Sequence, residues 1–383
     1  MPDADKRVTW FDRNPGKAKL IMAVIVVLVL EIFARVLVVA GLIPYQPYPT
    51  SRYPEFIDHM DREVGRWHYP NADVDVYDTC KTGRFVSNGV GAMDIERATD
   101  ANDAFRVAVV GDSFAAGYYV SFGERFTGLL EERTGIEHLN FAVSGTGTVH
   151  QSQVYRYKAS EFEHDAVIVA VLPVNDFENN RADAKPGKKY QPTVREVDGE
   201  LEIYYPVRYE DRYIKERSFG ERLKNRIDNT LYLMNALRLG SRVFKGWRRG
   251  EQLEDFAEQA PNYYDNYDEN DWRLMEFALR EIVAVAGDKP VVVVTLPYAK
   301  DIDYARTQGY NFRLVRQLSE FAAANKTVYY LDLLPGFAAA MADDQRDYQS
   351  YVWACDMHWN PDGHDVAAEL MYQGLAETLY SGE

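Results

Sequence analysis

Two segments that lie far apart in the sequence carry side chains suited to nucleophilic catalysis. Gly111-Asp-Ser113 directly follows a short apolar run, and Asp356-Met-His358 lies just before the last helical segment. An imidazole in a loop can reach a serine hydroxyl, and a nearby aspartate can hold its second ring nitrogen and fix the tautomer. The alternatives are a serine that caps the next helix and a histidine that is an ordinary exposed side chain. The presence of both segments in one chain favours catalysis.

Two further segments offer hydrogen-bond donors for a developing oxyanion. Ser144-Gly145-Thr-Gly147 follows the second apolar run, and glycine there lets backbone N–H groups approach a ligand closely. Asn175-Asp176 follows the third run, and an asparagine amide can donate a further hydrogen bond. Both segments also suit ordinary loops, because Gly, Asn and Asp favour turns for local reasons. Their role therefore depends on the fold that positions them.

These segments lie at the ends of regularly spaced apolar runs. Short runs rich in Val alternate with stretches of helical periodicity, which is the pattern of β-α-β units. The predicted strands are 105–111, 138–143, 166–173, 291–297 and 328–334, and the predicted helices are 122–134, 148–160, 271–286, 303–325 and 361–379. This alternation predicts a parallel sheet covered by helices on both faces. The carboxyl ends of its strands form the edge where ligands usually bind.

Taken in order, the four segments resemble the sequence blocks of the SGNH/GDSL hydrolase superfamily. The resemblance covers 105–175 and 271–380 and rests on Gly-Asp-Ser113, Ser-Gly145, Asn175-Asp and Asp356-x-His358. It implies a three-layer α/β/α, flavodoxin-like fold with a five-stranded parallel sheet, and neither cofactor nor metal. Two details differ from the common pattern: Pro-Val stands before Asn175 where Gly-x is frequent, and the acid precedes the histidine by two positions instead of three.

The resemblance also assigns roles to these residues. It implies that Ser113 is the nucleophile, His358 the general base and Asp356 the acid that orients it. The oxyanion donors would be the backbone N–H groups of Ser113 and Gly145 together with the side chain of Asn175.

Residues 20–43 form a long apolar segment near the N-terminus. This length, about 24 residues, is enough to cross a bilayer, which requires ~20. Glu31 and Arg35 interrupt it, but their i,i+4 spacing allows them to pair in a helix. Five Lys and Arg residues in 1–19 favour a cytoplasmic N-terminus and an extracytoplasmic, for example periplasmic, location for the rest. We expect an uncleaved signal anchor, with a cleaved signal peptide as the alternative.

The remaining chain divides into a linker region and a larger domain. Residues 44–103 are rich in Pro, Tyr and Asp and lack long periodic segments, which predicts a linker and an irregular N-terminal subdomain. Residues 104–383 are expected to form the catalytic domain, with a cap-like insertion at about 176–270. Within it, Val197-Asp-Gly-Glu200 predicts a hairpin. Residues 221–249 predict a basic amphipathic helix or helix pair, packed on the domain or, alternatively, touching the membrane surface.

Composition limits the classes of partner. The chain has 43 Lys and Arg against 59 Asp and Glu, a net charge of -16 that repels nucleic acids. Its two cysteines, Cys80 and Cys355, exclude a cysteine-based zinc module. They allow one disulfide in an oxidising compartment, although two unrelated thiols remain an alternative.

Three functions fit these observations. The first is an esterase that removes acyl groups, such as O-acetyl, from an extracytoplasmic glycan or lipid through an acyl-enzyme. The second is an O-acyltransferase that uses the same residues for polysaccharide acetylation, with a sugar hydroxyl replacing water. The third is a non-catalytic glycan-binding module of the cell envelope, against which the retained Ser113 and His358 argue.

Overall fold

The computed structural model describes most of the chain in two compact units. One unit comprises Met1–Ser51 and Arg217–Lys245, and the other comprises Arg52–Glu216 and Gly246–Glu383. The described residues are 9–43, 59–77, 82–117, 119–181, 191–206, 220, 223, 227, 230–241, 243, 244, 262–353 and 357–380.

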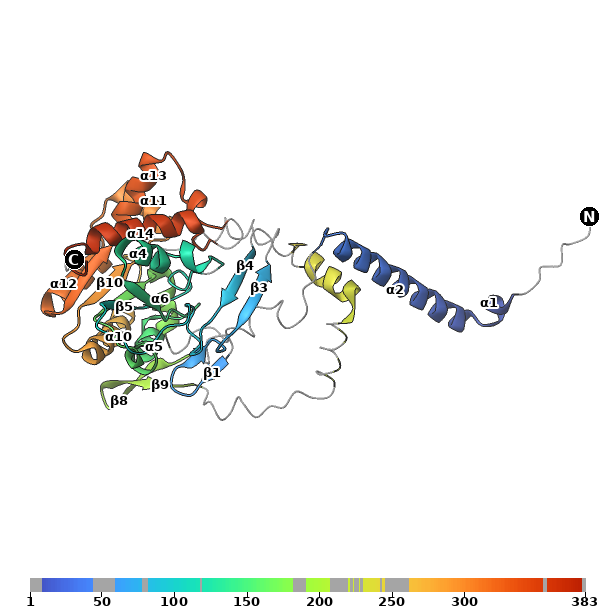
Figure 1. Cartoon of the computed structure of the whole chain (residues 1–383), viewed down its shortest axis with the longest axis horizontal. Helices are drawn as coiled ribbons and strands as arrows, with labels where there is room; N and C mark the ends of the chain where they lie inside the picture. The colour runs from blue at the N-terminus through green and yellow to red at the C-terminus, as the bar shows by residue number, and fades with distance from the viewer. Residues whose placement is uncertain are drawn as a thin grey trace, which may run out of the picture. The chain divides into compact units, whose positions relative to one another are not determined.

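The larger unit is built on a five-stranded parallel sheet (Figure 1). The strand order is β11-β10-β7-β5-β6, and every neighbouring pair is parallel. β5 is the first strand of this sheet in the sequence. The next strand, β6, lies on one side of it, and β7, β10 and β11 follow in turn on the other side, which is the flavodoxin-like order. The predicted fold is therefore confirmed, and β5 and β7 flank the point where the winding reverses. The strands are β5 Arg106–Gly111, β6 Glu137–Asn140, β7 Ala166–Val171, β10 Val291–Thr295 and β11 Val328–Asp332.

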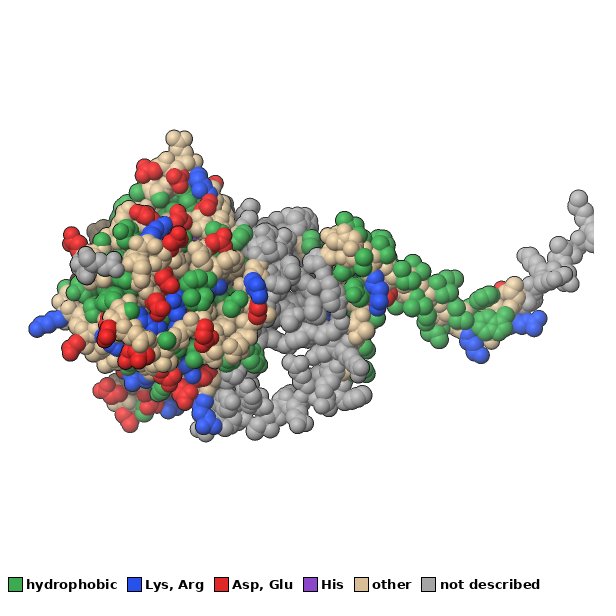
Figure 2. All heavy atoms as spheres, in the orientation of Figure 1, with side chains coloured by type: hydrophobic (Ala, Val, Ile, Leu, Met, Phe, Trp, Pro, Cys, Tyr) green, Lys and Arg blue, Asp and Glu red, His purple; other side chains and the backbone are tan. Residues whose placement is uncertain are grey.

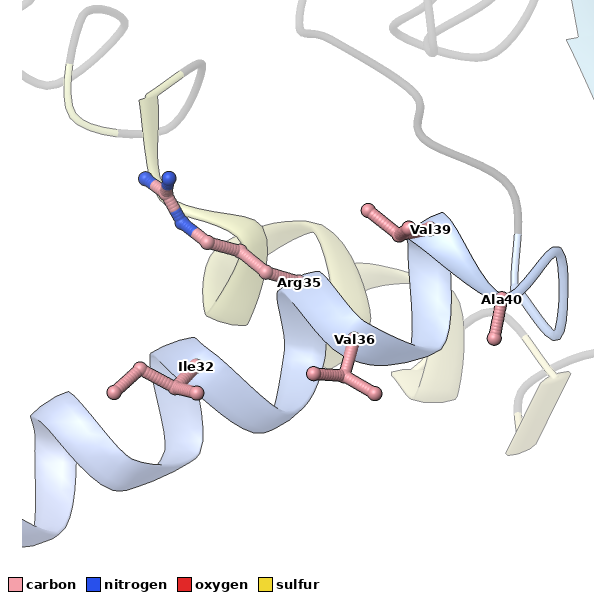
Figure 3. A pocket seen from close by; sticks show the side chains of 5 residues that line it. All are labelled: Ile32, Arg35, Val36, Val39 and Ala40. Atoms are coloured by element: carbon pink, nitrogen blue, oxygen red, sulfur yellow. The ribbon is translucent and has the colours of Figure 1, made fainter.

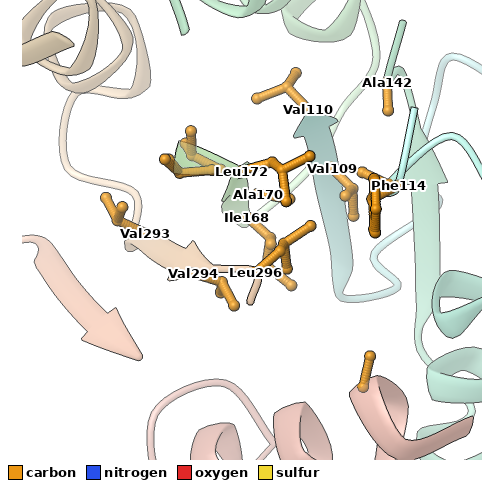
Figure 4. Close-up of a cluster of buried hydrophobic side chains, with 14 of the residues drawn as sticks. Val109, Val110, Phe114, Ala142, Ile168, Ala170, Leu172, Val293, Val294 and Leu296 are labelled. Carbon is orange, nitrogen blue, oxygen red and sulfur yellow. The ribbon is translucent and has the colours of Figure 1, made fainter. Parts of the chain in front are cut away.

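The three inner strands are buried along their whole length, because helices cover both faces of the sheet. Figure 4 shows part of the resulting core, in which Val109, Ile168 and Val294 come from three neighbouring strands. Their β-branched side chains favour extended backbone and pack well on a pleated surface. The core thus fixes the strand ends at which the candidate residues lie.

Helices lie on both sides of this sheet (Figure 1). α4 packs against α14 on one side, and α5 packs against α10 on the other. The predicted single helix 303–325 is wrong: it is two helices, because Gly309 takes a left-handed φ of 83° and ends the first. The helices are α4 Phe126–Thr134, α5 Thr148–Tyr157, α6 Pro173–Asn180, α10 Glu269–Ala286, α11 Ala299–Gln308, α12 Arg313–Ala324, α13 Leu334–Asp343 and α14 Pro361–Leu375.

The segment before the sheet is more regular than its composition predicts. Two antiparallel pairs are present: β1 His59–Asp61 with β2 Gly65–Trp67, and β3 Asp73–Tyr77 with β4 Thr82–Val86. The buried Trp67 anchors β2, and its indole N–H donates to the carbonyl of Val90 at 2.8 Å. The expectation of an irregular subdomain is thus corrected, because short strands stabilised by distant packing leave little periodicity in the sequence.

The hairpin predicted at Asp-Gly is confirmed. β8 Thr193–Val197 pairs with β9 Glu200–Tyr204, and Asp198 and Gly199 both have positive φ angles, 52° and 88°. Two central residues of this conformation make the turn that matches the twist of paired strands. α6 extends to Asn180, so the insertion expected at about 176–270 begins after this helix.

The smaller unit contains an apolar helix of membrane-spanning length. α2 Pro15–Val39 follows the short α1 Trp10–Arg13, and its visible surface in Figure 2 is mainly hydrophobic. The helix begins a few residues before the predicted segment 20–43 begins, and it ends a few residues before that segment ends. Its length and mean hydropathy of 2.8 suit a bilayer, although a signal sequence has the same properties. The predicted pairing of Glu31 and Arg35 is confirmed, with Nε of Arg35 donating to Glu31 at 3.0 Å.

A second helix of this unit contacts α2. Residues 232–241 are helical, and Glu31 accepts hydrogen bonds from the backbone N–H groups of Tyr232 at 3.1 Å and Leu233 at 2.8 Å. The guanidinium of Arg35 lies 4.7 Å from the centre of the Tyr232 ring. Beside Arg35 a shallow hollow of about 330 Å³ is lined by apolar side chains of α2 (Figure 3). The sequence favoured packing of this segment on the α/β domain, whereas the contacts described here join it to α2.

Candidate active site

Ser113 and His358 meet at the carboxyl edge of the sheet. Nε2 of His358 lies 2.8 Å from Oγ of Ser113, within hydrogen-bond distance. Ser113 is 3% exposed and follows β5, while His358 is half-buried and precedes α14. The fold thus joins two side chains separated by most of the domain, as the sequence predicts. This geometry is that of a serine whose proton can pass to an imidazole.

The turn that carries Ser113 depends on the glycine before it. A methyl group on Gly111 would lie only 2.5 Å from Cβ of Ala115 and 3.0 Å from Cβ of Ala170. Glycine therefore lets the chain fold back tightly at the end of β5, between the next turn and the neighbouring strand. The ring of Phe114, buried beneath, packs 5.1 Å from the imidazole of His358 and so holds its orientation.

Backbone contacts on both sides of His358 hold the loop that carries it. Val352 and Trp359 form an isolated antiparallel bridge, and the backbone N–H of Trp353 donates to the carbonyl of His358 at 2.8 Å. Met357 has a φ of 66°, a left-handed conformation that is costly for a bulky side chain. Such strain persists only where the surroundings impose it, and it is common at functional sites.

A side-chain cap marks the start of α14. The side chain of Asn360 accepts from the backbone N–H of Gly363 at 3.1 Å, and Pro361 occupies the first turn. This cap ends the loop two residues after His358, so the imidazole projects from irregular backbone rather than from the helix.

The acid expected to orient His358 lies outside the described residues. Asp356 and Cys355 both fall in 354–356, and Cys80 falls in 78–81. The contact between Asp356 and Nδ1 of His358, and the disulfide, therefore stay predictions.

Asp112 is a residue of the site that the sequence alone did not single out. Its side chain is fully buried and accepts from Nδ2 of Asn175 at 2.8 Å and from the backbone N–H of Phe114 at 2.9 Å. Burial raises the pKa of Asp112, while the hydrogen bond from Asn175 and the proximity of His358 favour its charged form. Asp112 thus links the strand end that carries Ser113 to the strand end that carries Asn175.

Asn175 therefore contacts the residue that precedes Ser113, and this contact already engages its amide. It belongs to α6, directly after β7, and one amide hydrogen is given to Asp112. An asparagine amide has two N–H donors, so the second remains for an oxyanion. Its orientation is set by a buried carboxylate, which is the kind of support that preorganised donors need.

Gly145 lies in the loop between β6 and α5. It has a φ of 68° and is partly exposed, and its carbonyl accepts from Nε2 of Gln191 at 2.7 Å. Gly147 must also be glycine, because a methyl group there would lie 2.6 Å from Oδ1 of Asn180. The loop is thus held from α6 and from the insertion, and its backbone can approach a ligand closely.

Among the residues that the structure describes, no group of three or more His, Cys, Asp or Glu side chains is arranged to hold a metal ion.

Comparison with known proteins gives distant similarities of structure only. No family model and no curated protein sequence matches the chain. A lipolytic protein of the G-D-S-L family from Veillonella parvula aligns at 13% identity and a TM-score of 0.35, over 70% of this chain and 97% of that one. An acetyl xylan esterase from Butyrivibrio proteoclasticus aligns at 12% identity and a TM-score of 0.36, over 73% of this chain and 65% of that one.

A family two carbohydrate esterase from Clostridium thermocellum aligns at 10% identity and a TM-score of 0.36, over 72% of this chain and 64% of that one. The chain thus spans slightly less than two thirds of both carbohydrate esterases. Because the identities and TM-scores are low, the assignment of function depends on the geometry of the site.

Proposed function

We propose that this chain is a serine-dependent ester hydrolase of the SGNH/GDSL type. The observation that carries the proposal is the 2.8 Å contact between Oγ of Ser113 and Nε2 of His358 at the reversal point of the sheet. Ligands of open α/β sheets bind at this point. The sequence blocks that resemble the superfamily all lie at the same edge in the described structure, apart from Asp356.

The groups present support a two-step acyl transfer. Nε2 of His358 accepts the proton of Ser113 as Oγ attacks the ester carbonyl, and the resulting imidazolium then protonates the leaving alcohol. The acyl group remains on Ser113. A water molecule, deprotonated by the same imidazole, then attacks the acyl-enzyme and releases the acid. The second N–H of Asn175 and backbone N–H groups of Ser113 and Gly145 are the donors proposed for the oxyanion.

The proposed substrate is an acyl ester, such as an O-acetyl ester, of an extracytoplasmic glycan or lipid. α2 is proposed to anchor the chain in the membrane, with the positive residues before it in the cytoplasm and the α/β domain outside. The net charge of -16 is consistent with a role that does not involve nucleic acid.

Transfer of the acyl group to a sugar hydroxyl is the second candidate. The observation that favours it is Gln191, a residue of the insertion that is 2% exposed and bonded to the carbonyl of Gly145. An insertion that contacts the loop of Gly145 can limit the access of water to an acyl-enzyme. An acyltransferase requires such exclusion of water. A binding module without catalysis fits less well, since it needs no paired serine and imidazole.

The test uses Ser113→Ala in the full-length protein. We expect the release of acetate from 4-nitrophenyl acetate and acetylated polysaccharides to fall by several orders of magnitude. Thermal unfolding should change little, because the hydroxyl holds no part of the core. The wild type is assayed with and without sugar acceptors, so that hydrolysis and transfer are separated by their products. Near-normal turnover by Ser113→Ala would show that another residue is the nucleophile.

A further inference from the structure

A buried acid of α2 caps the second helix of the smaller unit. The two carboxylate oxygens of Glu31 accept hydrogen bonds from the backbone N–H groups of Tyr232 and Leu233, at 3.1 Å and 2.8 Å. These two residues begin the helix 232–241, and the first N–H groups of a helix have no carbonyl partner within it. The carboxylate thus supplies from α2 the acceptors that this helix end lacks.

Both helices bury polar side chains and expose apolar ones. On α2, Glu31 is buried while Leu28 is exposed. On the helix 232–241, Asn235 is only 2% exposed, whereas Leu237 is 58% exposed. A helix on the surface of a water-soluble domain shows the opposite arrangement, with its apolar residues buried. The pattern is typical of helices that are surrounded by hydrocarbon, where polar side chains face the interior of the bundle.

The position of Glu31 along α2 sets the depth of this contact. Lys19 is the last positive residue before the apolar stretch of α2, so it marks the inner boundary of the proposed span. At about 1.5 Å per residue, Glu31 lies about 18 Å beyond Lys19 along the helix. Since the hydrocarbon layer is about 30 Å thick, the contact with Tyr232 lies about 12 Å below its outer boundary. The start of the helix 232–241 is therefore within the bilayer.

A carboxylate and unpaired N–H groups are both costly in hydrocarbon, and here they satisfy each other. No water is available at that depth, so backbone donors must find acceptors within the protein. The charge of Glu31 is balanced by Arg35, whose Nε donates to it at 3.0 Å. The guanidinium also lies 4.7 Å from the centre of the Tyr232 ring, a cation–π contact. The charged pair that interrupts the apolar segment is thus the docking point of the second helix.

The helix 232–241 is too short to cross the bilayer. Its ten residues span about 15 Å, half of the hydrocarbon layer. In the sequence it lies between β9 and α10, which both belong to the larger unit, so the chain enters and leaves the bilayer on the side of that unit. Residues 221–249 carry eight Lys and Arg in a chain whose net charge is -16. Such a local excess of positive charge favours anionic lipid headgroups at the surface.

From these contacts we propose that the helix 232–241 is a re-entrant element embedded in the outer half of the bilayer, docked on α2 through Glu31, with lipid acyl chains covering Leu237. The inference goes beyond ester hydrolysis and rests on one part of the proposed function, namely that α2 anchors the chain in the membrane. It makes the insertion a second attachment of the α/β domain to the membrane.

The experiment labels the full-length protein in vesicles of phosphatidylethanolamine and phosphatidylglycerol. The vesicles contain a phosphatidylcholine with a photoactivatable diazirine, either in the middle of an acyl chain or on the headgroup, and mass spectrometry maps the labelled residues. We expect the acyl-chain probe to label Leu237 as well as Leu28 of α2. Tyr329, a large side chain exposed on β11 of the α/β domain, is the matched control and should stay unlabelled.

Substitutions of Glu31 test the docking. Glu31→Leu removes both acceptors, so labelling of Leu237 by the acyl-chain probe should fall to background while α2 stays labelled. Glu31→Gln keeps one acceptor oxygen and should retain part of the labelling. Glu96→Leu is the matched control, because Glu96 also accepts a backbone N–H, from Gly89 at 2.8 Å, but is exposed in the α/β domain. Thermal unfolding followed by circular dichroism shows whether the α/β domain of each variant is folded.

The outcomes separate this inference from the anchor on which it rests. Absence of label at Leu28, with recovery of a soluble chain that begins near Gly41, would contradict the anchor itself. Label at Leu28 but not at Leu237 would overturn only the embedded helix. Label at Leu237 from the headgroup probe alone would place the helix on the membrane surface, and a cross-link between two copies through residues 232–241 would make a second copy its partner. Both results overturn the proposal, and unchanged labelling in Glu31→Leu overturns docking through Glu31.

Discussion

Asp112 and Asn175 form the hydrogen bond that joins the two central strand ends of the site. This bond, 2.8 Å long, holds the amide of Asn175 next to the residue that precedes Ser113. It uses one of the two amide N–H groups, so the other is left for an oxyanion. We expect Asn175→Ala to lower kcat by about 10²–10³, the usual effect of removing one oxyanion donor. KM for a small ester should change much less, because the donor acts mainly in the transition state. Steady-state kinetics on 4-nitrophenyl acetate check this.

The control for this substitution is Asn311→Ala. Asn311 is exposed on the linker between α11 and α12, and its side chain accepts from Arg316 of α12. Urea unfolding shows whether either variant is destabilised. If Asn175→Ala raised KM with kcat unchanged, Asn175 would bind the ground state and the donor role would be wrong.

At the residue scale, the sequence is sufficient where the type of a side chain and the motif around it together indicate its chemistry. Ser113 and His358 were found in this way, and the structure brings them together. Asp112 was missed although it precedes Ser113 directly. A buried carboxylate acquires a role only when the fold places Asn175 beside it, and β5 and β7 are distant in sequence.

At the element scale, two acids lie near the carboxyl ends of β10 and β11: Asp301 is buried and Asp332 is half-buried. Their proximity has a consequence for stability. Asp301, in the first turn of α11, is 2% exposed, and burial raises its pKa to about 7, with the charge of Asp332 acting in the same direction. Below the ordinary value of 3.8 both folded and unfolded chains hold the proton. As pH rises towards 7 the unfolded chain ionises first, so the stability contributed by the protonated Asp301 is progressively lost.

Asp301→Asn removes this titration while keeping an oxygen for the backbone N–H of Tyr298, which Asp301 accepts at 2.9 Å. The free energy of unfolding of the variant minus that of wild type should therefore increase between pH 4 and pH 7.5. The increase is at most about 4 kcal/mol, since one pKa unit corresponds to about 1.4 kcal/mol. Urea unfolding across this range measures it. Asp303→Asn on the same helix is the control, and a difference independent of pH would contradict the assignment.

The helices and strands also show which physical effects leave a recognisable pattern in the sequence. The inner strands were predicted because burial on both faces demands continuous apolar runs, as in Val291–Thr295. The hairpin at Asp198 was predicted from local turn chemistry. The break between α11 and α12 was missed, since helical periodicity continues on both sides of Gly309. The strands at 59–86 were missed because their stability comes from long-range packing, such as that of Trp67.

At the scale of the whole molecule, β4 and the loop that carries His358 both contact residues of the segment 113–119. Gly83 of β4 lies three residues after Cys80, and a methyl group there would be 2.9 Å from Cα of Tyr119. The ring of Phe85 lies 5.5 Å from that of Tyr119. His358 lies three residues after Cys355 and contacts Ser113. Each cysteine thus lies three positions in the sequence from a residue that contacts the segment 113–119.

The bond predicted between Cys80 and Cys355 requires their Cα atoms to lie within ~7 Å of each other. Outside the cytoplasm thiols are oxidised, and the bond would tie the subdomain of β3 and β4 to the loop of Asp356 and His358. Closing so long a loop stabilises by up to ~4–5 kcal/mol in the chain-entropy model. We expect protein purified without reductant to show no titratable thiol in denaturant. Dithiothreitol should lower esterase activity before it lowers the helical signal in circular dichroism, because the loop loosens first.

Single and double cysteine variants give the decisive comparison. Cys80→Ser, Cys355→Ser and the double variant should lose similar amounts of activity and of thermal stability, because breaking the bond once removes its whole effect. The two single variants are the matched controls for each other, since each keeps one of the two thiols. Two independent buried thiols would instead give effects that add in the double variant, together with two titratable groups in the wild type.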